Sequence, residues 1–156
     1  MNITFRYSIT AFLAFLALTL VVLPLGAQTN LDPTRWEADM QAFEKQDQMN
    51  PPSQGAILLT GSSSIARWND QAAAALAPLT VIPRGFGGSV MNDVLYHLDR
   101  VALNYKPRAI LIYEGDNDTA FGVPVEKVID QLHLVINRIH SALPETRIYV
   151  LSVKPS

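Results

Sequence analysis

The fold of this chain is decided by the stretch Ala56-Ile57-Leu58-Leu59-Thr60-Gly61-Ser62-Ser63-Ser64. Its first five residues form a short apolar run without alternation, which is typical of a strand that is covered on both faces. A glycine and three serines follow at once, so the run ends in a turn from which a helix can start. Strands of this kind belong to parallel sheets that lie between two layers of helices.

Three more short apolar runs follow along the chain, at residues 79–82, 109–113 and 147–153. Segments with the apolar spacing or composition of helices separate them, and another such segment precedes the first strand. The expected helices cover residues 32–48, 68–76, 90–103 and 125–143. This alternation predicts an α/β fold, with a parallel sheet, helices on both faces and right-handed crossovers.

The composition limits the domain organisation and the partners. The chain has 156 residues, of which 49% are hydrophobic and 17% charged, so it can build one compact core. The net charge of -2 and the lack of any Lys and Arg run argue against nucleic acid and against polybasic attraction to a membrane. The absence of cysteine excludes disulfides, thiolate zinc sites and a Cys nucleophile, so any nucleophile must be an oxygen.

Residues 1–27 have the pattern of an export signal. Arg6 supplies a positive charge, residues 9–23 are almost continuously apolar, and Pro24-Leu25-Gly26-Ala27 ends the run before polar residues. We therefore expect a periplasmic or secreted protein whose single domain covers residues 28–156. The alternative is an uncleaved membrane anchor, because Leu25 stands where a small residue is commoner.

Three of the four expected strands run into polar or glycine-rich loops. In open parallel sheets, ligands bind beyond the carboxyl ends of the strands. The loops are Gly61-Ser62-Ser63-Ser64, Gly85-Phe86-Gly87-Gly88-Ser89 and Gly115-Asp116-Asn117-Asp118. Taken singly, each is explained by helix caps, turns or positive φ angles. Together they offer a hydroxyl nucleophile, an approachable glycine amide and an Asn donor, which are the parts of an acyl-transfer site with an oxyanion hole.

The same three loops resemble, in order, the first three sequence blocks of the SGNH (GDSL-like) hydrolases. Residues 59–65 are similar to the Gly-Asp-Ser block, residues 84–89 to the second block, and residues 115–118 match Gly-x-Asn-Asp. The resemblance implies a three-layer α/β/α flavodoxin-like fold and a serine esterase. It places Ser63 as the nucleophile, with the Gly88 backbone, the Asn117 side chain and the Ser63 amide as oxyanion donors. It implies no metal and no organic cofactor.

The resemblance implies an ester substrate without naming one, because the family acts on lipids, short-chain acyl esters, thioesters and acetylated sugars. Two positions depart from its pattern. Ser62 stands where the family most often has Asp, and Gly87 where it often has Ser, but neither position is catalytic. We expect Ser62 and Ser64 to be cap or loop residues, although an alignment shifted by one position would exchange them with Ser63.

The sequence has one Asp-x-x-His spacing, Asp130-Gln131-Leu132-His133, but it falls inside the helix expected over residues 125–143 and before the fourth strand. The family's fourth block, which lies near the carboxyl terminus, is therefore expected to be missing. The chain ends at Lys154-Pro155-Ser156, directly after the fourth expected strand, so we expect the closing strand and helix of the fold to be missing. The three histidines, His97, His133 and His140, fall in helices, and we expect them to be exposed or partly buried and away from the strand ends. Without its base the chain is expected to be essentially inactive.

Two other functions stay open on the sequence. The first is a non-catalytic module that binds a carbohydrate or acyl group in the same crevice. The second is a nucleotide or flavin binder that uses Gly85-Phe86-Gly87-Gly88 as a phosphate loop, which the missing Walker lysine and the export signal disfavour. Near the site, Asp116 and Asp118 suit turn and cap roles, and Glu114 is a candidate for substrate contact.

Overall fold

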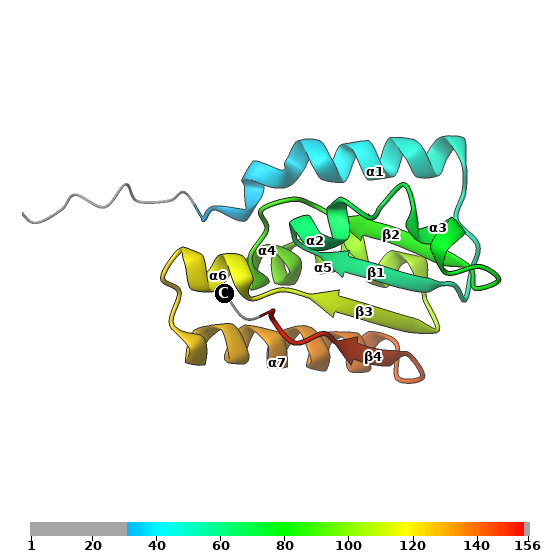
Figure 1. Ribbon diagram of the computed structural model, residues 1–156. Helices are drawn as coiled ribbons and strands as arrows, with labels where there is room; N and C mark the ends of the chain where they lie inside the picture. The colour runs from blue at the N-terminus through cyan, green and yellow to red at the C-terminus, as the bar shows by residue number, and fades with distance from the viewer. Residues whose placement is uncertain (1–30, 155–156) are drawn as a thin grey trace, which may run out of the picture.

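The computed structural model describes residues 31–154. Its strands form one parallel sheet in the order β2-β1-β3-β4 (Figure 1). Their bounds are β1 Ile57–Gly61, β2 Val81–Gly85, β3 Ala109–Tyr113 and β4 Arg147–Val150. The strand order reverses between β1 and β3, which is the switch point where flavodoxin-like folds bind ligands. The predicted α/β fold with a parallel sheet is confirmed.

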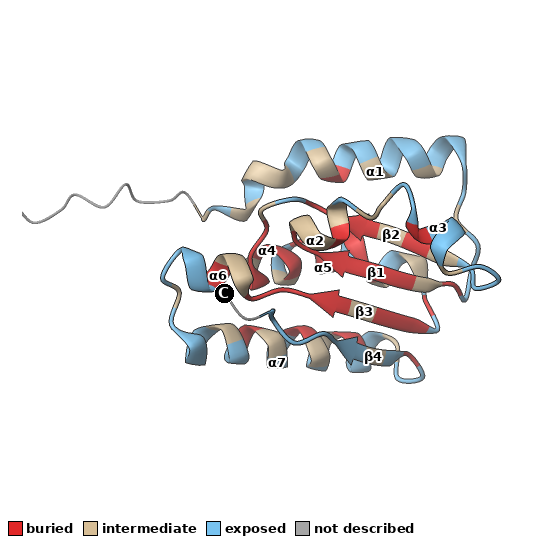
Figure 2. Ribbon diagram, viewed as in Figure 1, coloured by how far each residue is buried: buried red, intermediate tan, exposed pale blue. Residues whose placement is uncertain are grey.

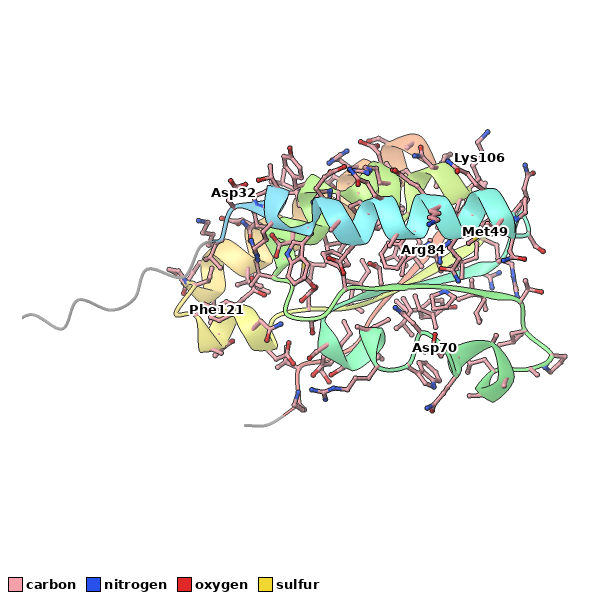
Figure 3. The ribbon with its side chains drawn as sticks, turned by 90° about the horizontal axis from the view of Figure 1, so that it is seen from above. Asp32, Met49, Asp70, Arg84, Lys106 and Phe121 are labelled. Atoms are coloured by element: carbon pink, nitrogen blue, oxygen red, sulfur yellow. The ribbon has the colours of Figure 1, made fainter. Side chains whose placement is uncertain are left out.

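Helices cover both faces of the sheet, as the view from above shows, with Arg84 on the side of α1 and Asp70 on the side of α2 and α3 (Figure 3). One face carries η1 (Pro33–Trp36), α1 (Glu37–Met49), α4 (Met91–Tyr96), α5 (Leu98–Val101) and α7 (Val125–Ala142). The other carries α2 (Ser63–Ala66) and α3 (Ala72–Ala75). The remaining short elements are η2 (Leu103–Tyr105) and α6 (Asp116–Ala120). The arrangement is the three-layer sandwich expected from the sequence.

The core lies on both sides of the central strands. Leu58 and Ile110 point towards α1, α4 and α7, where Ile139 is also fully buried. Leu59 points the other way, against Ile65 of α2. Figure 2 shows β1, β2 and β3 largely buried and β4 mostly exposed, with Ile148 half-buried. The continuous apolar character of the first strand therefore reflects burial on both faces.

Several element bounds differ from those predicted. The helix expected over residues 90–103 breaks at His97, which takes non-helical angles of φ -90° and ψ 11°. The helix expected over 68–76 shrinks to α3, and the strand expected over 79–82 lies at Val81–Gly85. The last strand ends at Val150 instead of residue 153. Helices α2 and α6 were not predicted, because four or five residues are too few to show a helical period.

His97 is buried, with 2% of its surface exposed, so the prediction of an exposed or partly buried side chain is wrong. Its Nε2 lies 2.8 Å from the carbonyl oxygen of Pro33, and its ring meets those of Phe86 and Tyr96 edge-on. The η1 segment covers this histidine. Because Pro33 lies 64 residues before His97, nothing in the sequence around His97 indicates the contact. His133 and His140 are exposed on α7, as expected.

The segment 1–27, expected to direct export, lies outside the described residues. Within residues 31–154, no helix is long and apolar enough to cross a membrane. Export and its alternative, an anchor formed by the first residues, both stay predictions.

Candidate active site

The three loops singled out in the sequence follow the carboxyl ends of β1, β2 and β3, at one edge of the sheet (Figure 1). A Cβ atom built on Gly87 would lie 3.9 Å from Cα and Cβ of Ser63, so the second loop packs against the start of α2. The Asn117 side-chain amide donates a hydrogen bond of 2.8 Å to the carbonyl oxygen of Ser89. The structure therefore brings Ser63, Gly88 and Asn117 to the same place.

Glycines permit the close approach of these loops. Gly61, at the end of β1, has φ +139°, and a Cβ there would lie 2.1 Å from the carbonyl oxygen of Tyr113. That oxygen instead accepts a hydrogen bond of 3.1 Å from the Ser62 amide. A Cβ on Gly85 would lie 2.3 Å from the Ala66 nitrogen. A larger residue at Gly61 would push the end of β1 away from β3, and one at Gly85 would push α2 away from the end of β2.

Burial separates the three serines. Ser62 is completely buried, and its hydroxyl donates to Asp116 Oδ1 at 3.1 Å. Ser63 is the first residue of α2, is partly exposed, and its hydroxyl has no hydrogen-bond partner among residues 31–154. Ser64 is also partly exposed, but it is Ser63 that lies against Gly87. Of the three hydroxyls, that of Ser63 combines access with a position beside the second loop.

Three N–H groups beside Ser63 are available to a ligand. The backbone amides of Ser63 and Gly88 donate to no atom of the described part of the chain, and Gly88 has φ +92°. The Asn117 amide has two hydrogens, one of which is directed at Ser89. Such donors from three different loops stabilise negative charge that develops on a carbonyl oxygen.

The aspartates around the site serve the loops themselves. Asp118 is buried, and both of its oxygens accept from the Met91 amide at 3.1 Å, so it caps the start of α4 as predicted. Asp116 accepts from Ser62 and, at 3.0 Å, from both Lys154 and the Asn117 amide. Partial burial acts to raise the pKa of Asp116, but these donors outweigh it and the pKa is lowered. Asp116 therefore stays ionised, and the Tyr113 hydroxyl at 3.5 Å is a fourth donor to it.

Glu114 lies inside the protein, with 4% of its surface exposed, and its contact with substrate stays a prediction. Its Oε1 accepts a hydrogen bond of 2.5 Å from the Ser89 hydroxyl. Its Oε2 is buried and has no partner among the described residues. Burial raises the pKa of Glu114 well above its ordinary value, despite the Ser89 bond. The sequence signal for this was a glutamate directly after the buried strand β3.

No side chain in residues 31–154 accepts a hydrogen bond from the Ser63 hydroxyl, so none is in place as its general base. His133 and His140 are exposed on α7, and His97 is held by Pro33. Lys154 comes near the third loop, where its Nζ lies 3.0 Å from Asp116 Oδ2. Its hydrogen bond to Asp116 raises the pKa of Lys154, so the amine keeps its proton and is a poor base.

Trp36 of η1 is a neighbour of the site that sequence reasoning missed. Its Cη2 would lie 3.5 Å from a Cβ on Gly88, and its ring meets Phe86 edge-on, with centroids 5.6 Å apart. The adjacent Arg35 pairs with Asp93 of α4 at 2.5 Å. The segment before α1 is thus fixed over the second loop. An aromatic residue ahead of the first helix was the available signal, but its partner lies far along the chain.

Two hollows of about 540 and 520 Å³ lie elsewhere. The first is lined by polar residues such as Glu44, Asp47 and Arg100, and the second by Ile57, Arg147 and others near the start of the strands. Neither contains Ser63, Gly88 or Asn117. Within residues 31–154, no three acidic or histidine side chains are grouped to hold a metal ion.

Comparison with known proteins agrees with this fold. Residues 49–156 match the model of the GDSL-like lipase/acylhydrolase family. Similar solved structures include a protein from Streptococcus pneumonia whose name refers to platelet activating factor (24% identity, TM-score 0.67). A GDSL-like lipase from Bacteroides thetaiotaomicron (15%, 0.62) and the esterase EstA from Pseudoalteromonas sp. (23%, 0.51) are also similar. A search of curated proteins found no match.

The three similar structures belong to longer chains. They align over 76%, 81% and 63% of this chain and over 55%, 60% and 62% of their own lengths, respectively. This chain therefore spans a little over half of the solved structures that it resembles. At these identities the likeness establishes the fold, and the chemistry has to be argued from the site.

Proposed function

Because this chain belongs to the GDSL-like lipase/acylhydrolase family, we propose that it carries the acylation site of a serine esterase with Ser63 as the nucleophile. One observation supports this assignment above the others. Ser63 is partly exposed, its hydroxyl is unbonded, and its Cα and Cβ lie against the loop that presents the free Gly88 amide. Asn117 is bonded to that same loop.

The proposed reaction begins when Ser63 Oγ attacks the carbonyl carbon of an ester and gives its proton to a base. The carbonyl oxygen takes up the electron pair and becomes an oxyanion, which the amides of Ser63 and Gly88 and the Asn117 side chain hold by hydrogen bonds. The tetrahedral species then collapses, and the base returns the proton to the leaving oxygen, which departs as the neutral alcohol. Water, giving a proton to the same base, then attacks the acyl carbon, and Ser63 leaves with that proton as the carboxylic acid is released. Losing one such donor typically costs about 3 to 4 kcal/mol of transition-state stabilisation.

The base is the component that these 156 residues do not supply. Their one Asp-x-x-His spacing, Asp130 to His133, lies on α7, where both side chains are exposed. No side chain of the described part of the chain is hydrogen-bonded to the Ser63 hydroxyl. Loss of the base lowers turnover in serine hydrolases by roughly 10⁴ to 10⁶. We therefore propose that this chain alone turns over esters very slowly, while Ser63 remains open to acylation when a base is added.

The experiment is to incubate the chain with p-nitrophenyl acetate and imidazole, and to locate acetylated residues by peptide mass spectrometry. The proposal expects an acetyl group on Ser63 in the wild type and in Ser64→Ala, and none on this segment in Ser63→Ala. Ser64→Ala is the matched control, because it removes the other partly exposed serine. Acetylation of Ser62 or Ser64 instead of Ser63 would refute the assignment.

The same experiment distinguishes an enzyme from a binding module. If Ser63 is never acetylated, while the chain binds an acetylated sugar or a short-chain ester equally well in the wild type and in Ser63→Ala, then the crevice binds without catalysis. Calorimetric titration of both proteins with the uncleaved ester provides that comparison.

Localisation is a separate proposal that depends on residues 1–27. We propose that this segment directs export and is removed near Gln28, on the strength of its positive start, apolar run and small residues. Sequencing the amino terminus of protein recovered from the periplasm or medium tests this. A chain that stays in the membrane with residue 1 intact would support the anchor instead.

A further inference from the structure

We propose that Glu114 is a positioning residue for the oxyanion site: through the Ser89 hydroxyl it fixes the loop whose carbonyl holds the Asn117 amide. This inference rests on the proposed function, because the role given to Glu114 is to position the proposed oxyanion donors. It concerns a group that does not itself touch the reacting atoms.

Two hydrogen bonds in series carry the inference. Ser89 Oγ donates to Glu114 Oε1 at 2.5 Å, and Asn117 Nδ2 donates to the Ser89 carbonyl oxygen at 2.8 Å. Ser89 is completely buried and Glu114 is 4% exposed, so water does not compete for the first bond. Hydrogen bonds in such surroundings are stronger than at the surface and hold their partners in one arrangement.

The second bond decides where the Asn117 amide points. A side-chain amide carries two hydrogens in one plane, so directing one of them at the Ser89 carbonyl fixes the direction of the other. Without that acceptor the side chain could rotate about its two torsions into other rotamers. Because the Ser89 backbone belongs to the loop that contains Gly88, the same anchor holds two of the three proposed donors.

The charges that face Glu114 come from two helices. Asp93 belongs to α4, and Asp116 and Asp118 belong to α6. Asp93 is paired with Arg35 at 2.5 Å, and Asp116 with Lys154 at 3.0 Å. The three carboxylates add to the effect of burial, which is the main cause of the raised pKa of Glu114.

This environment raises the pKa of Glu114 and so favours its protonated, neutral form. A neutral acid accepts the Ser89 bond without placing negative charge beside the proposed oxyanion site. Once Glu114 loses its proton at higher pH, the buried charge opposes an oxyanion nearby. Glu114→Gln keeps an oxygen acceptor for Ser89 and cannot ionise, so it isolates the effect of charge from that of the anchor.

The first test follows the Asn117 side-chain amide by ¹⁵N NMR, with its signals assigned by their loss in Asn117→Asp. In the wild type we expect these signals to shift between neutral and alkaline pH, and in Glu114→Gln we expect no shift over that range. Ser89→Ala should move the signals at every pH, because the anchor is lost. Thr146→Val is the control, because it also removes a buried hydroxyl. Thr146 donates to the Pro107 carbonyl oxygen near the amino ends of β3 and β4, away from the proposed site.

A purely structural role for Glu114 predicts a different outcome. In that case Ser89→Ala and Glu114→Gln would lower stability as Thr146→Val does and leave the Asn117 signals unchanged. A shift with pH that persists in Glu114→Gln would assign the effect to another group, such as Asp118 or Lys154. Either result overturns the inference. If Ser89→Ala does not fold, the comparison of Glu114→Gln with the wild type still decides.

The second test measures the rate at which p-nitrophenyl acetate acetylates Ser63. We expect Ser89→Ala to slow acetylation by roughly tenfold to 10²-fold, the effect of small misplacements in an active site. As the pH is raised through the range in which Glu114 ionises, the rate in Glu114→Gln should rise relative to that of the wild type. If the wild type is not acetylated at all, the proposed function is refuted. The NMR experiment still tests whether Glu114 controls the position of the Asn117 amide.

Discussion

At the scale of single residues, Gly61 is the backbone position on which the candidate site depends most directly. Its φ of +139° is unfavourable for any residue with a side chain, and a Cβ built there would lie only 2.1 Å from the Tyr113 carbonyl oxygen. We expect Gly61→Ala to lower the free energy of unfolding by about 3 kcal/mol or more, because strain and a backbone clash add. Unfolding in urea measures the loss.

Gly55→Ala is the matched control for that substitution. Gly55 also has a positive φ, +68°, but no atom lies within 4 Å of a Cβ built there. Its variant should lose about 1 to 2 kcal/mol from the backbone conformation alone. Equal losses in the two variants would contradict the role given to the Tyr113 contact.

Glu114 should also make stability depend on pH. Its folded pKa lies above the unfolded value, so its contribution is full below the unfolded pKa of about 4.5 and is lost as pH rises towards the folded pKa. Within that window the wild type should lose about 1.4 kcal/mol per pH unit relative to Glu114→Gln. Denaturant unfolding of both proteins over a pH series gives this difference.

The control for this prediction is Glu126→Gln, which replaces an exposed glutamate in the first turn of α7. Its stability difference from the wild type should vary little with pH compared with that of Glu114→Gln. A difference between wild type and Glu114→Gln that stays constant with pH would show that Glu114 is charged in the folded protein.

At the scale of elements, the two faces of α7 should contribute very differently to the free energy of unfolding. Ile139 is completely buried, and Leu134, on the opposite face of the same helix, is 51% exposed. We expect Ile139→Ala to lower the free energy of unfolding by about 2 to 5 kcal/mol, because it leaves a cavity in the core. Leu134→Ala should change it by less than about 0.5 kcal/mol, as exposed sites do.

Thermal or urea unfolding of the two α7 variants checks this contrast. A large loss in Leu134→Ala would mean that another part of the protein covers the exposed face of α7. A small loss in Ile139→Ala would contradict the packing of α7 against the sheet.

Long elements were predicted well and short ones poorly. Strand β3 lies at the residues expected, and α7 ends one residue earlier than expected, because each has a strong apolar pattern of its own. The helix expected over residues 90–103 is broken at His97, whose side chain is held by Pro33. Helices of four or five residues, such as α2 and α6, are stabilised by tertiary packing and by neighbouring loops, so local sequence does not reveal them.

At the scale of the whole molecule, stability should fall from the centre of the sheet to β4. β1 and β3 are almost entirely buried, whereas Tyr149 and Val150 of β4 are 52% and 43% exposed. We expect amides of β1 and β3 to exchange hydrogen most slowly and those of β4 much faster, because local opening of β4 uncovers little apolar surface. Hydrogen exchange measured by NMR reports each strand. Equal protection of β4 and β1 would contradict this order.

The sequence by itself determined the class of fold, the family resemblance and the three loops of the site. Apolar runs and helical spacing are local properties that can be read from the sequence. The order of the three blocks along the chain does not depend on where each helix begins or ends. Those signals were sufficient to name Ser63, Gly88 and Asn117 as candidates. Their chemical roles are proposals.

The tertiary structure decided what each polar side chain near the loops is available to do. It buried Ser62 and left Ser63 accessible, enclosed Glu114 against Ser89, and laid Trp36 beside Gly88. These outcomes depend on contacts between residues that lie far apart in the chain. Burial and electrostatic environment arise only when the layers pack together, so no local pattern of residues could specify them.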